Sequence, residues 1–200
     1  KDSADLTHPG NPLYVINRSG SSDLVLLDTP DFDTGARGAY INRDVTRLAL
    51  EASDIFIYIF TNSNYNNRDN TDFMSQMLTG IGTRKCFLIY RVYPSFTDRE
   101  VREHAMTVAG GIYGDDAAKN LLGIYRADED NRVAAEKSFM KLRPVPPDSL
   151  EFLSALAAVD AAELRLELHA SILKDVLKKA ATLLGDAQCS LDELQLYLDE

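Results

Sequence analysis

The chain has 200 residues, 45% of them apolar and 26% charged, which is enough for one folded domain with an additional segment. Its net charge of −10 and isoelectric point near 4.8 argue against a nucleic-acid ligand, because neutralising phosphates requires clustered lysine and arginine. The two cysteines have neither metal-binding spacing nor a disulfide framework, so we expect a cytoplasmic protein. No apolar run approaches the roughly 20 residues that span a bilayer, so membrane contact would be peripheral and through regions outside this chain.

The first three quarters of the chain predict strands that alternate with helices. The first two strands are separated by a short polar turn and form a hairpin, which supplies one antiparallel edge. The later strands alternate with helices, which is typical of βαβ units in a mostly parallel sheet with helices on both faces. We predict strands at 13–17, 24–27, 54–60, 86–90 and 121–125, and helices at 41–53, 71–80 and 97–110.

The last quarter of the chain predicts helices only. The proline-rich segment 143–147 breaks the strand and helix pattern and is interpreted as a linker. Asp148, with Glu151 three residues later, is predicted to cap a helix, and a second cap at Ser190 predicts a final short helix. The predicted fold class is α/β, with an N-terminally incomplete domain at 1–143 and a helical extension at 144–200.

The most specific motif is the aliphatic run 24–27 followed by Asp28-Thr29-Pro30-Asp31. A carboxylate at the end of a buried parallel strand lies where open α/β sheets bind ligands. The motif resembles the magnesium-side motif, usually Asp-x-x-Gly, of the P-loop GTPases of the Era-like and dynamin-like kind. This resemblance implies that Asp28 serves Mg²⁺ and that the backbone N–H of Asp31 contacts the γ-phosphate. Asp31 stands where the family usually has glycine, so a negative side chain is added there.

The same resemblance implies two further binding positions. Thr7 precedes the hairpin, where the family has a switch threonine that binds both Mg²⁺ and the γ-phosphate, although it could simply begin a loop. Tyr90 and Arg91 stand where the family has Asn-Lys-x-Asp, and Arg91 could cover the base in place of lysine. Tyr93 cannot accept hydrogen bonds as a carboxylate does, which predicts relaxed base specificity. The alternative is an ordinary strand end with Tyr and Arg at its rim.

A phosphate-binding loop is the missing part of this pattern. None of the eleven glycines begins Gly-x-x-x-x-Gly-Lys-Ser/Thr, the loop that holds the β-phosphate. We therefore expect that the loop of a GTPase would lie before Lys1, and that this chain alone binds GTP weakly at best.

Two functions remain open at this point. The first is a Mg²⁺-dependent GTP-binding and GTP-hydrolysing domain, which would use an oriented water and no covalent intermediate, with guanine nucleotide as partner. The sequence names no catalytic residue that positions this water. The resemblance also permits a homodimer formed through the nucleotide face or the C-terminal helices. The alternative is a degenerate GTPase fold that acts as a non-catalytic protein-binding or scaffolding module. Another α/β phosphoacceptor domain would require a second acidic cluster at neighbouring strand ends, which the sequence lacks.

Overall fold

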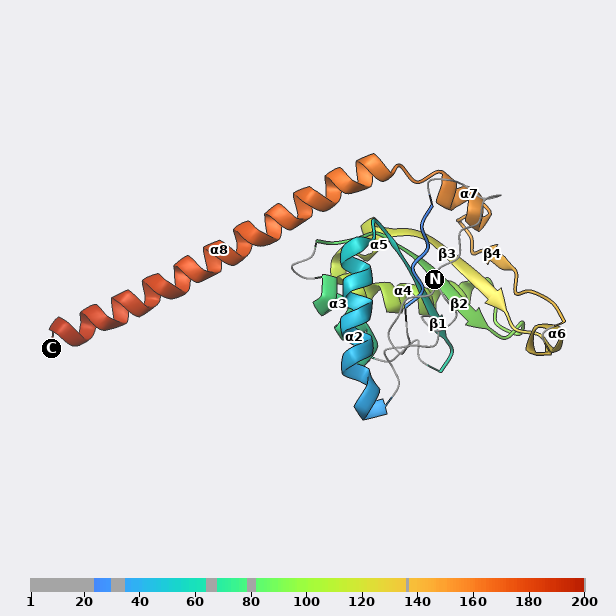
Figure 1. The fold of residues 1–200 in the computed structure, drawn as a ribbon, viewed down its shortest axis with the longest axis horizontal. Helices are drawn as coiled ribbons and strands as arrows, with labels where there is room; N and C mark the ends of the chain where they lie inside the picture. The colour runs from blue at the N-terminus through green and yellow to red at the C-terminus, as the bar shows by residue number, and fades with distance from the viewer. Residues whose placement is uncertain (1–23, 30–34, 64–67, 79–81, 136, 200) are drawn as a thin grey trace, which may run out of the picture.

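A computed structural model of the chain describes residues 24–29, 35–63, 68–78, 82–135 and 137–199. The described residues form one four-stranded sheet with the order β1-β2-β3-β4, and Figure 1 shows it with helices around it. The first three strands are parallel and β4 pairs antiparallel with β3. The α/β class with a mostly parallel sheet is thus confirmed. The strands are β1 (Phe56–Thr61), β2 (Cys86–Val92), β3 (Leu121–Asp128) and β4 (Leu142–Pro144).

The strand predicted at 24–27 does not form in the described structure. Residues 24–29 have no regular secondary structure, and the aliphatic side chains from Leu24 to Leu27 are 43–80% exposed. A strand forms only when a neighbour pairs with its backbone groups, and no described residue provides such a neighbour here. The antiparallel edge therefore comes from β4 and not from the opening hairpin. The other hairpin strand, 13–17, lies outside the described residues.

The predicted helices of the sheet region are confirmed, with shifted ends. They are α2 (Gly35–Ala52), α3 (Arg68–Leu78) and α4 (Asp98–Tyr113). The sequence signal is clearest at α4, where the Thr97 hydroxyl accepts from the Glu100 N–H and the Glu100 carboxylate accepts from the Thr97 N–H. Short helical turns follow at η1 (Gly114–Asp116), α5 (Ala117–Asn120) and α6 (Asn131–Ala134).

The central strands β2 and β3 are buried on both faces, as is usual for parallel strands. Alternate residues of β2, such as Cys86, Leu88 and Tyr90, join a core cluster with residues of α2, α3 and α4. The intervening Phe87 and Ile89 join a second cluster, where the Phe87 ring lies 5.5 Å from that of Phe152 in α7 (Phe152–Ala157). Period-two burial in the central strand thus gives each face of the sheet its own helical cover.

The segment after β3 differs from its prediction. A short strand, β4, forms where the sequence predicted a linker, and the neighbouring Val145 is fully buried with its N–H donating to the Ile124 carbonyl. Asp148 does not begin a helix, because its carboxylate accepts from the Ile124 N–H at 2.9 Å and so holds the chain against β3. Helix α7 begins four residues later.

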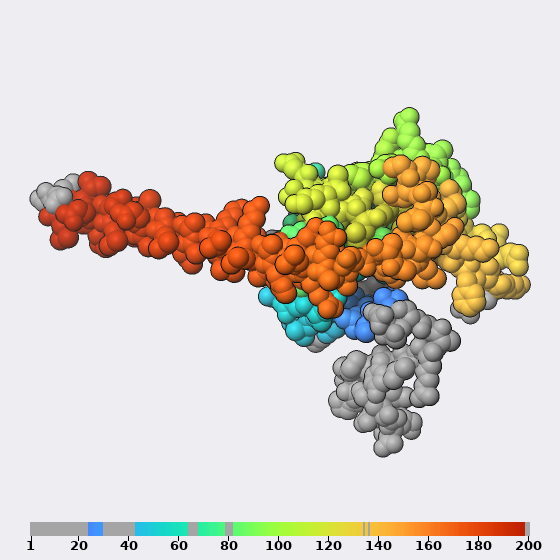
Figure 2. Space-filling view, turned by 90° about the horizontal axis from the view of Figure 1, so that it is seen from above, coloured from blue at the N-terminus to red at the C-terminus, as the bar shows by residue number. Residues whose placement is uncertain are grey.

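The second predicted cap is also wrong, because one helix, α8 (Ala161–Asp199), runs through it. Asp160 caps its start, accepting hydrogen bonds from the N–H groups of Ala162 and Glu163. The Ser190 hydroxyl donates to the Asp186 carbonyl within the helix, so it does not start a new one. With 39 residues, α8 is about 58 Å long and projects away from the sheet, as Figures 1 and 2 show. None of the described helices combines the length and apolar character needed to cross a membrane.

Arg84 joins the end of α2 to the loop before β2. Its buried guanidinium donates to three backbone carbonyls, those of Glu51, Ser53 and Gly82, at 2.8–3.0 Å. Two of these carbonyls belong to the last residues of α2 and the turn after it, where a helix leaves carbonyls without intrahelical partners. One side chain therefore provides hydrogen-bond donors to carbonyl groups of both segments.

Candidate functional site

The carboxyl edge of the sheet is the part of this fold where ligands ordinarily bind. Strands β1, β2 and β3 are parallel and end there together. Their last residues and the residues just after them carry polar side chains, which form two separate groups. The first group is centred on Tyr90 and the second on Arg126.

Tyr90 lies in the core and carries its hydroxyl to a buried polar contact. The ring is fully buried and stacks on that of Phe60, with centroids 4.6 Å apart. The hydroxyl donates to Asn62 Oδ1 and also lies 2.9 Å from His104 Nδ1. A hydroxyl has one proton, so while it donates to Asn62 it accepts from the Nδ1–H of His104. The structure therefore places Tyr90 behind the sheet edge and ties β1, β2 and α4 together through it.

The side chain of Arg91, in contrast, reaches the surface. Its guanidinium donates to Glu129 Oε1 at 2.6 Å, and both side chains are partly exposed. Because period-two alternation places neighbouring residues on opposite faces, Tyr90 and Arg91 diverge. Of the two, Arg91 is the one with a planar cation at the rim, where a ligand can reach it. Its ion pair is solvent-accessible and therefore weak enough to open for a ligand.

Arg126 anchors the second group and is itself buried, with 2% of its surface exposed. It donates to Asp98 Oδ1 at 2.8 Å, to the Phe96 carbonyl at 2.8 Å and to Asp128. Arg143 of β4 donates two further bonds to Asp98, each 2.8 Å long. Four charged side chains from β3, α4 and β4 thus neutralise one another at this edge.

The electrostatics of this group follow from its cations. The Arg143 guanidinium, helped by Arg126 and opposed by desolvation, lowers the pKa of Asp98 to about 2. The same pairing raises the pKa of Arg143. Asp98 therefore stays ionised at neutral pH and is fully engaged, which gives it a structural role. This ion network was not identified from the sequence. The sequence feature that points to it is Arg126, a charged residue within an otherwise apolar strand.

Of the residues predicted to bind magnesium and phosphate, the structure describes only one. Thr7 and Asp31 lie outside the described residues. Asp28 is described and exposed, in the segment that lacks strand structure. Within the described ranges, no three His, Cys, Asp or Glu side chains gather closely enough to hold a metal ion. The structure therefore places Arg91 at the carboxyl edge, Tyr90 buried behind that edge, and Asp28 outside the sheet.

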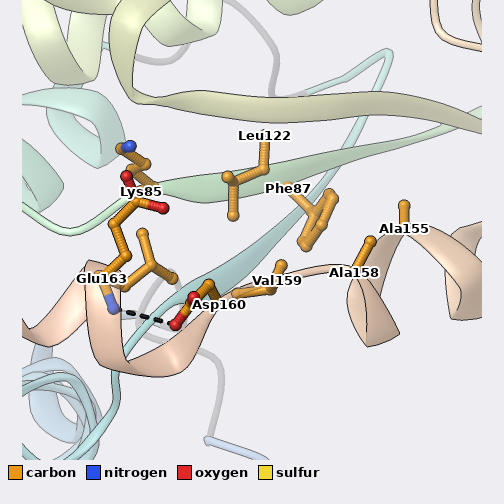
Figure 3. A pocket seen from close by; sticks show the side chains of 9 residues that line it. Lys85, Phe87, Leu122, Ala155, Ala158, Val159, Asp160 and Glu163 are labelled. Atoms are coloured by element: carbon orange, nitrogen blue, oxygen red, sulfur yellow. Dashed lines mark hydrogen bonds between the residues drawn. The ribbon is translucent and has the colours of Figure 1, made fainter.

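A cavity of about 240 Å³ lies at the other end of the sheet, between the strands and the turn that joins α7 to α8 (Figure 3). Lys85 precedes β2 and Leu122 belongs to the first residues of β3, so the cavity faces the amino ends of the strands. It is smaller than the roughly 300–1,000 Å³ typical of ligand pockets. The cavity is lined by Lys85, Phe87, Leu122, Ala155, Ala158, Val159, Asp160, Glu163 and Leu164.

Two of the three charged side chains that line this cavity have structural partners. Asp160 caps α8, as the dashed bond from the Glu163 N–H in Figure 3 shows. Lys85 pairs with Glu167 of α8 at 2.7 Å. We therefore interpret the cavity as a packing gap under the α7–α8 turn, and the carboxyl edge as the candidate functional site.

Comparison with known proteins adds no assignment to this geometry. No protein-family model, curated protein or solved structure matches the chain. Function therefore has to be inferred from the residues themselves and from their places in the sheet.

Proposed function

We propose that this chain is part of a Mg²⁺-dependent GTP-binding and GTP-hydrolysing domain of the Era-like or dynamin-like kind, with relaxed base specificity. The observation that carries the proposal is that two segments lack a neighbouring strand. Strand β1 has no partner on its outer side among the described residues, and the aliphatic run 24–27 has no strand partner there either. One further parallel strand would complete both.

The phosphate loop of a P-loop GTPase follows such a strand, so the same missing element accounts for the absent loop. Four consecutive aliphatic side chains, 43–80% exposed, are costly to leave in water. Pairing of 24–27 as a strand would bury them and bring Asp28 to the carboxyl edge, where Arg91 already lies. The proposal thus explains why the most strand-like run in the sequence is not a strand here.

The Asp28 carboxylate is suited to a magnesium site in which water and phosphate oxygens supply the other ligands. Mg²⁺ prefers oxygen ligands, keeps several waters and commonly takes only one or two carboxylates together with phosphate oxygens. One exposed carboxylate is compatible with that coordination, whereas an all-protein cage is not available in the described residues. When bound, Mg²⁺ would neutralise charge on the β- and γ-phosphates. Asp28 would hold it, Thr7 would add a hydroxyl, the Asp31 N–H would contact the γ-phosphate and Arg91 would cover the base.

The experiment is a calorimetric titration of the full gene product with GTP, with and without Mg²⁺. Asp28→Asn should weaken Mg²⁺-dependent binding by roughly tenfold or more, because the neutral amide is a poor magnesium ligand. Asp115→Asn, which alters an exposed carboxylate in η1, is the matched control. An absence of Mg²⁺-dependent binding, or equal affinity in the Asp28 variant, would refute the proposal.

Two further titrations separate the roles of the residues. Arg91→Ala should weaken GTP and leave inorganic triphosphate unchanged, because a cation over the base cannot affect a ligand that lacks one. The 200-residue chain by itself should bind GTP no better than weakly, and micromolar affinity there would show that the phosphates are held by residues other than those proposed.

A second candidate function has its own support. Tyr90 is sealed in the core and Arg126, Asp98, Asp128 and Arg143 satisfy one another, so much of the carboxyl edge is closed by its own side chains. This favours a degenerate GTPase fold that serves as a non-catalytic protein-binding or scaffolding module. A gene product that is folded, binds partner protein and shows no Mg²⁺-dependent nucleotide binding would select this function over the first.

A further inference from the structure

Helix α8 has two apolar faces, and the domain covers only one of them. Leu164 is buried, and Leu168 and Ile172 pack against the backbone at Gly82. On the same face the Ser171 hydroxyl accepts from the Thr83 N–H at 3.1 Å. Beyond Asp175, every side chain described on the helix is exposed. Figure 2 shows this part of α8 extending past the rest of the described chain.

The uncovered face carries a heptad repeat. From residue 166 to residue 198, every position in the alternating 4-and-3 spacing of a coiled-coil seam is leucine or alanine. This seam lies on the opposite side of the helix from the residues that dock on the domain. Its leucines are 59–80% exposed. The seam consists of Leu166, Ala170, Leu173, Leu177, Ala180, Leu184, Ala187, Leu191, Leu194 and Leu198.

The seam is large enough to form a stable interface. Its seven leucines, buried on two copies at roughly 60–100 Å² each, bring the leucine contribution alone close to the lower bound of about 1,200 Å² for specific interfaces. Val176, Leu183 and Tyr197 flank the seam on one side, are also exposed and would add to the buried area. A second copy of the same helix is therefore a sufficient partner.

Side-chain volumes select the direction of pairing. In a parallel pair each residue faces its own copy, so Ala180 meets Ala180 and Ala187 meets Ala187, which leaves gaps between layers of paired leucines. In an antiparallel pair centred at Thr182, Leu184 faces Ala180 of the partner subunit and Leu177 faces Ala187 of the partner subunit. Every alanine of the seam then faces a leucine, so no layer is left with two alanines.

Charge selects the same direction. The middle of α8 is basic, with Lys174, Lys178 and Lys179, and the following part is acidic, with Asp186, Asp192 and Glu193. A parallel pair places the basic part beside its own copy, whereas an antiparallel pair places it beside the acidic part. Opposite charges at these distances attract within a Debye length, and like charges repel.

We propose that α8 binds the α8 helix of a second copy of this chain as an antiparallel two-stranded coiled coil over residues 166–198. Each copy keeps its own domain on the other face of α8, so the two domains lie at opposite ends of the pair. The proposal is independent of nucleotide binding, because it uses no residue of the carboxyl edge.

The first test is the mass of the 200-residue chain in solution by sedimentation equilibrium. We expect a dimer at micromolar concentration. Leu184→Asp should weaken dimerisation by roughly 100-fold or more, because it buries an unpaired charge in the seam. The matched control is Leu196→Asp, on the same helix and 68% exposed against 72% for Leu184, but outside the seam. A monomer, a larger oligomer, or equal effects of the two variants would refute the proposal.

The second test reads the direction of the pair by disulfide formation. Leu173 and Leu191 occupy one layer of the antiparallel pair and different layers of a parallel one. In a Cys189→Ser background, which removes an exposed thiol, Leu173→Cys and Leu191→Cys chains should cross-link only when mixed. Cross-linking of either variant with itself would show parallel pairing. Dimerisation should also weaken as salt is raised, whereas a parallel pair would strengthen.

Discussion

The ion network around Asp98 gives a sharp prediction about stability. Replacing Asp98 by asparagine keeps the shape of the side chain and removes the charge that faces both Arg126 and Arg143. The pKa of Asp98 is lowered from 3.8 to about 2, which corresponds to about 2 kcal/mol of unfolding free energy at neutral pH. The carboxylate is 32% exposed, and solvent screening reduces this to about 1–2 kcal/mol.

The substitution also affects Arg126, which is 97% buried at its side chain and would keep only one carboxylate partner, Asp128. Loss of a partner by a buried charge adds to the cost, so we expect Asp98→Asn to lower the free energy of unfolding by about 2 kcal/mol in total. Urea denaturation followed by circular dichroism at pH 7 measures this difference. Asp115→Asn, at an exposed carboxylate, should change stability by less than about 0.5 kcal/mol.

The pH dependence tests the cause. A lowered pKa stabilises the fold above the ordinary value of 3.8, and this stabilisation is lost as the pH falls through about 2. At pH 3 about half of the electrostatic part should remain, so the gap between the wild type and Asp98→Asn should narrow between pH 5 and pH 3. A gap of constant size over this range would refute the electrostatic explanation and leave only lost hydrogen bonds.

Three other predictions concern the core, the base of α8 and the thiols. Tyr90→Phe removes two buried hydrogen bonds and should cost about 1–2 kcal/mol in urea denaturation, whereas Tyr93→Phe, at an exposed ring, should cost almost nothing. Gly82→Ala should destabilise the protein by at least about 1 kcal/mol, because the residue has φ +88 and its added Cβ would lie 2.5 Å from a side chain of α8; unchanged stability would show that the base of α8 packs loosely. In the native protein a thiol reagent should modify the exposed Cys189 and spare Cys86, whose burial raises its pKa to about 12, and denaturant should release the second thiol.

The sequence was informative wherever a local pattern decides the structure. The apolar runs of β1, β2 and β3 are short, rich in β-branched and aromatic residues and bounded by polar segments, so they are recognisable without knowledge of their neighbours. The capping box at Thr97 fixes the start of α4 through contacts within three residues. These elements place Arg91 at the carboxyl edge, so that part of the candidate site could be predicted, whereas the burial of Tyr90 behind the edge could not.

The sequence was not informative where a distant partner decides. Residues 24–27 look like a strand and have no ladder among the described residues, while the proline-containing β4 does not look like a strand and becomes one by pairing with Tyr125, Arg126 and Ala127. Asp148 has the chemistry of a helix cap, but β3 uses it instead. The Arg126 network draws on three elements that are up to 45 residues apart, and no single motif encodes it.

The hydrogen bonds of Arg84 have a consequence for local unfolding. The loop whose Gly82 carbonyl accepts from Arg84 also packs against Leu168 and Ile172, so this loop contacts both the end of α2, through Arg84, and the first turns of α8. Opening of this loop would therefore release contacts of both helices. Amide protons in the final turn of α2 and in the root of α8 should consequently exchange with solvent at one common rate, as a single cooperative unit of unfolding.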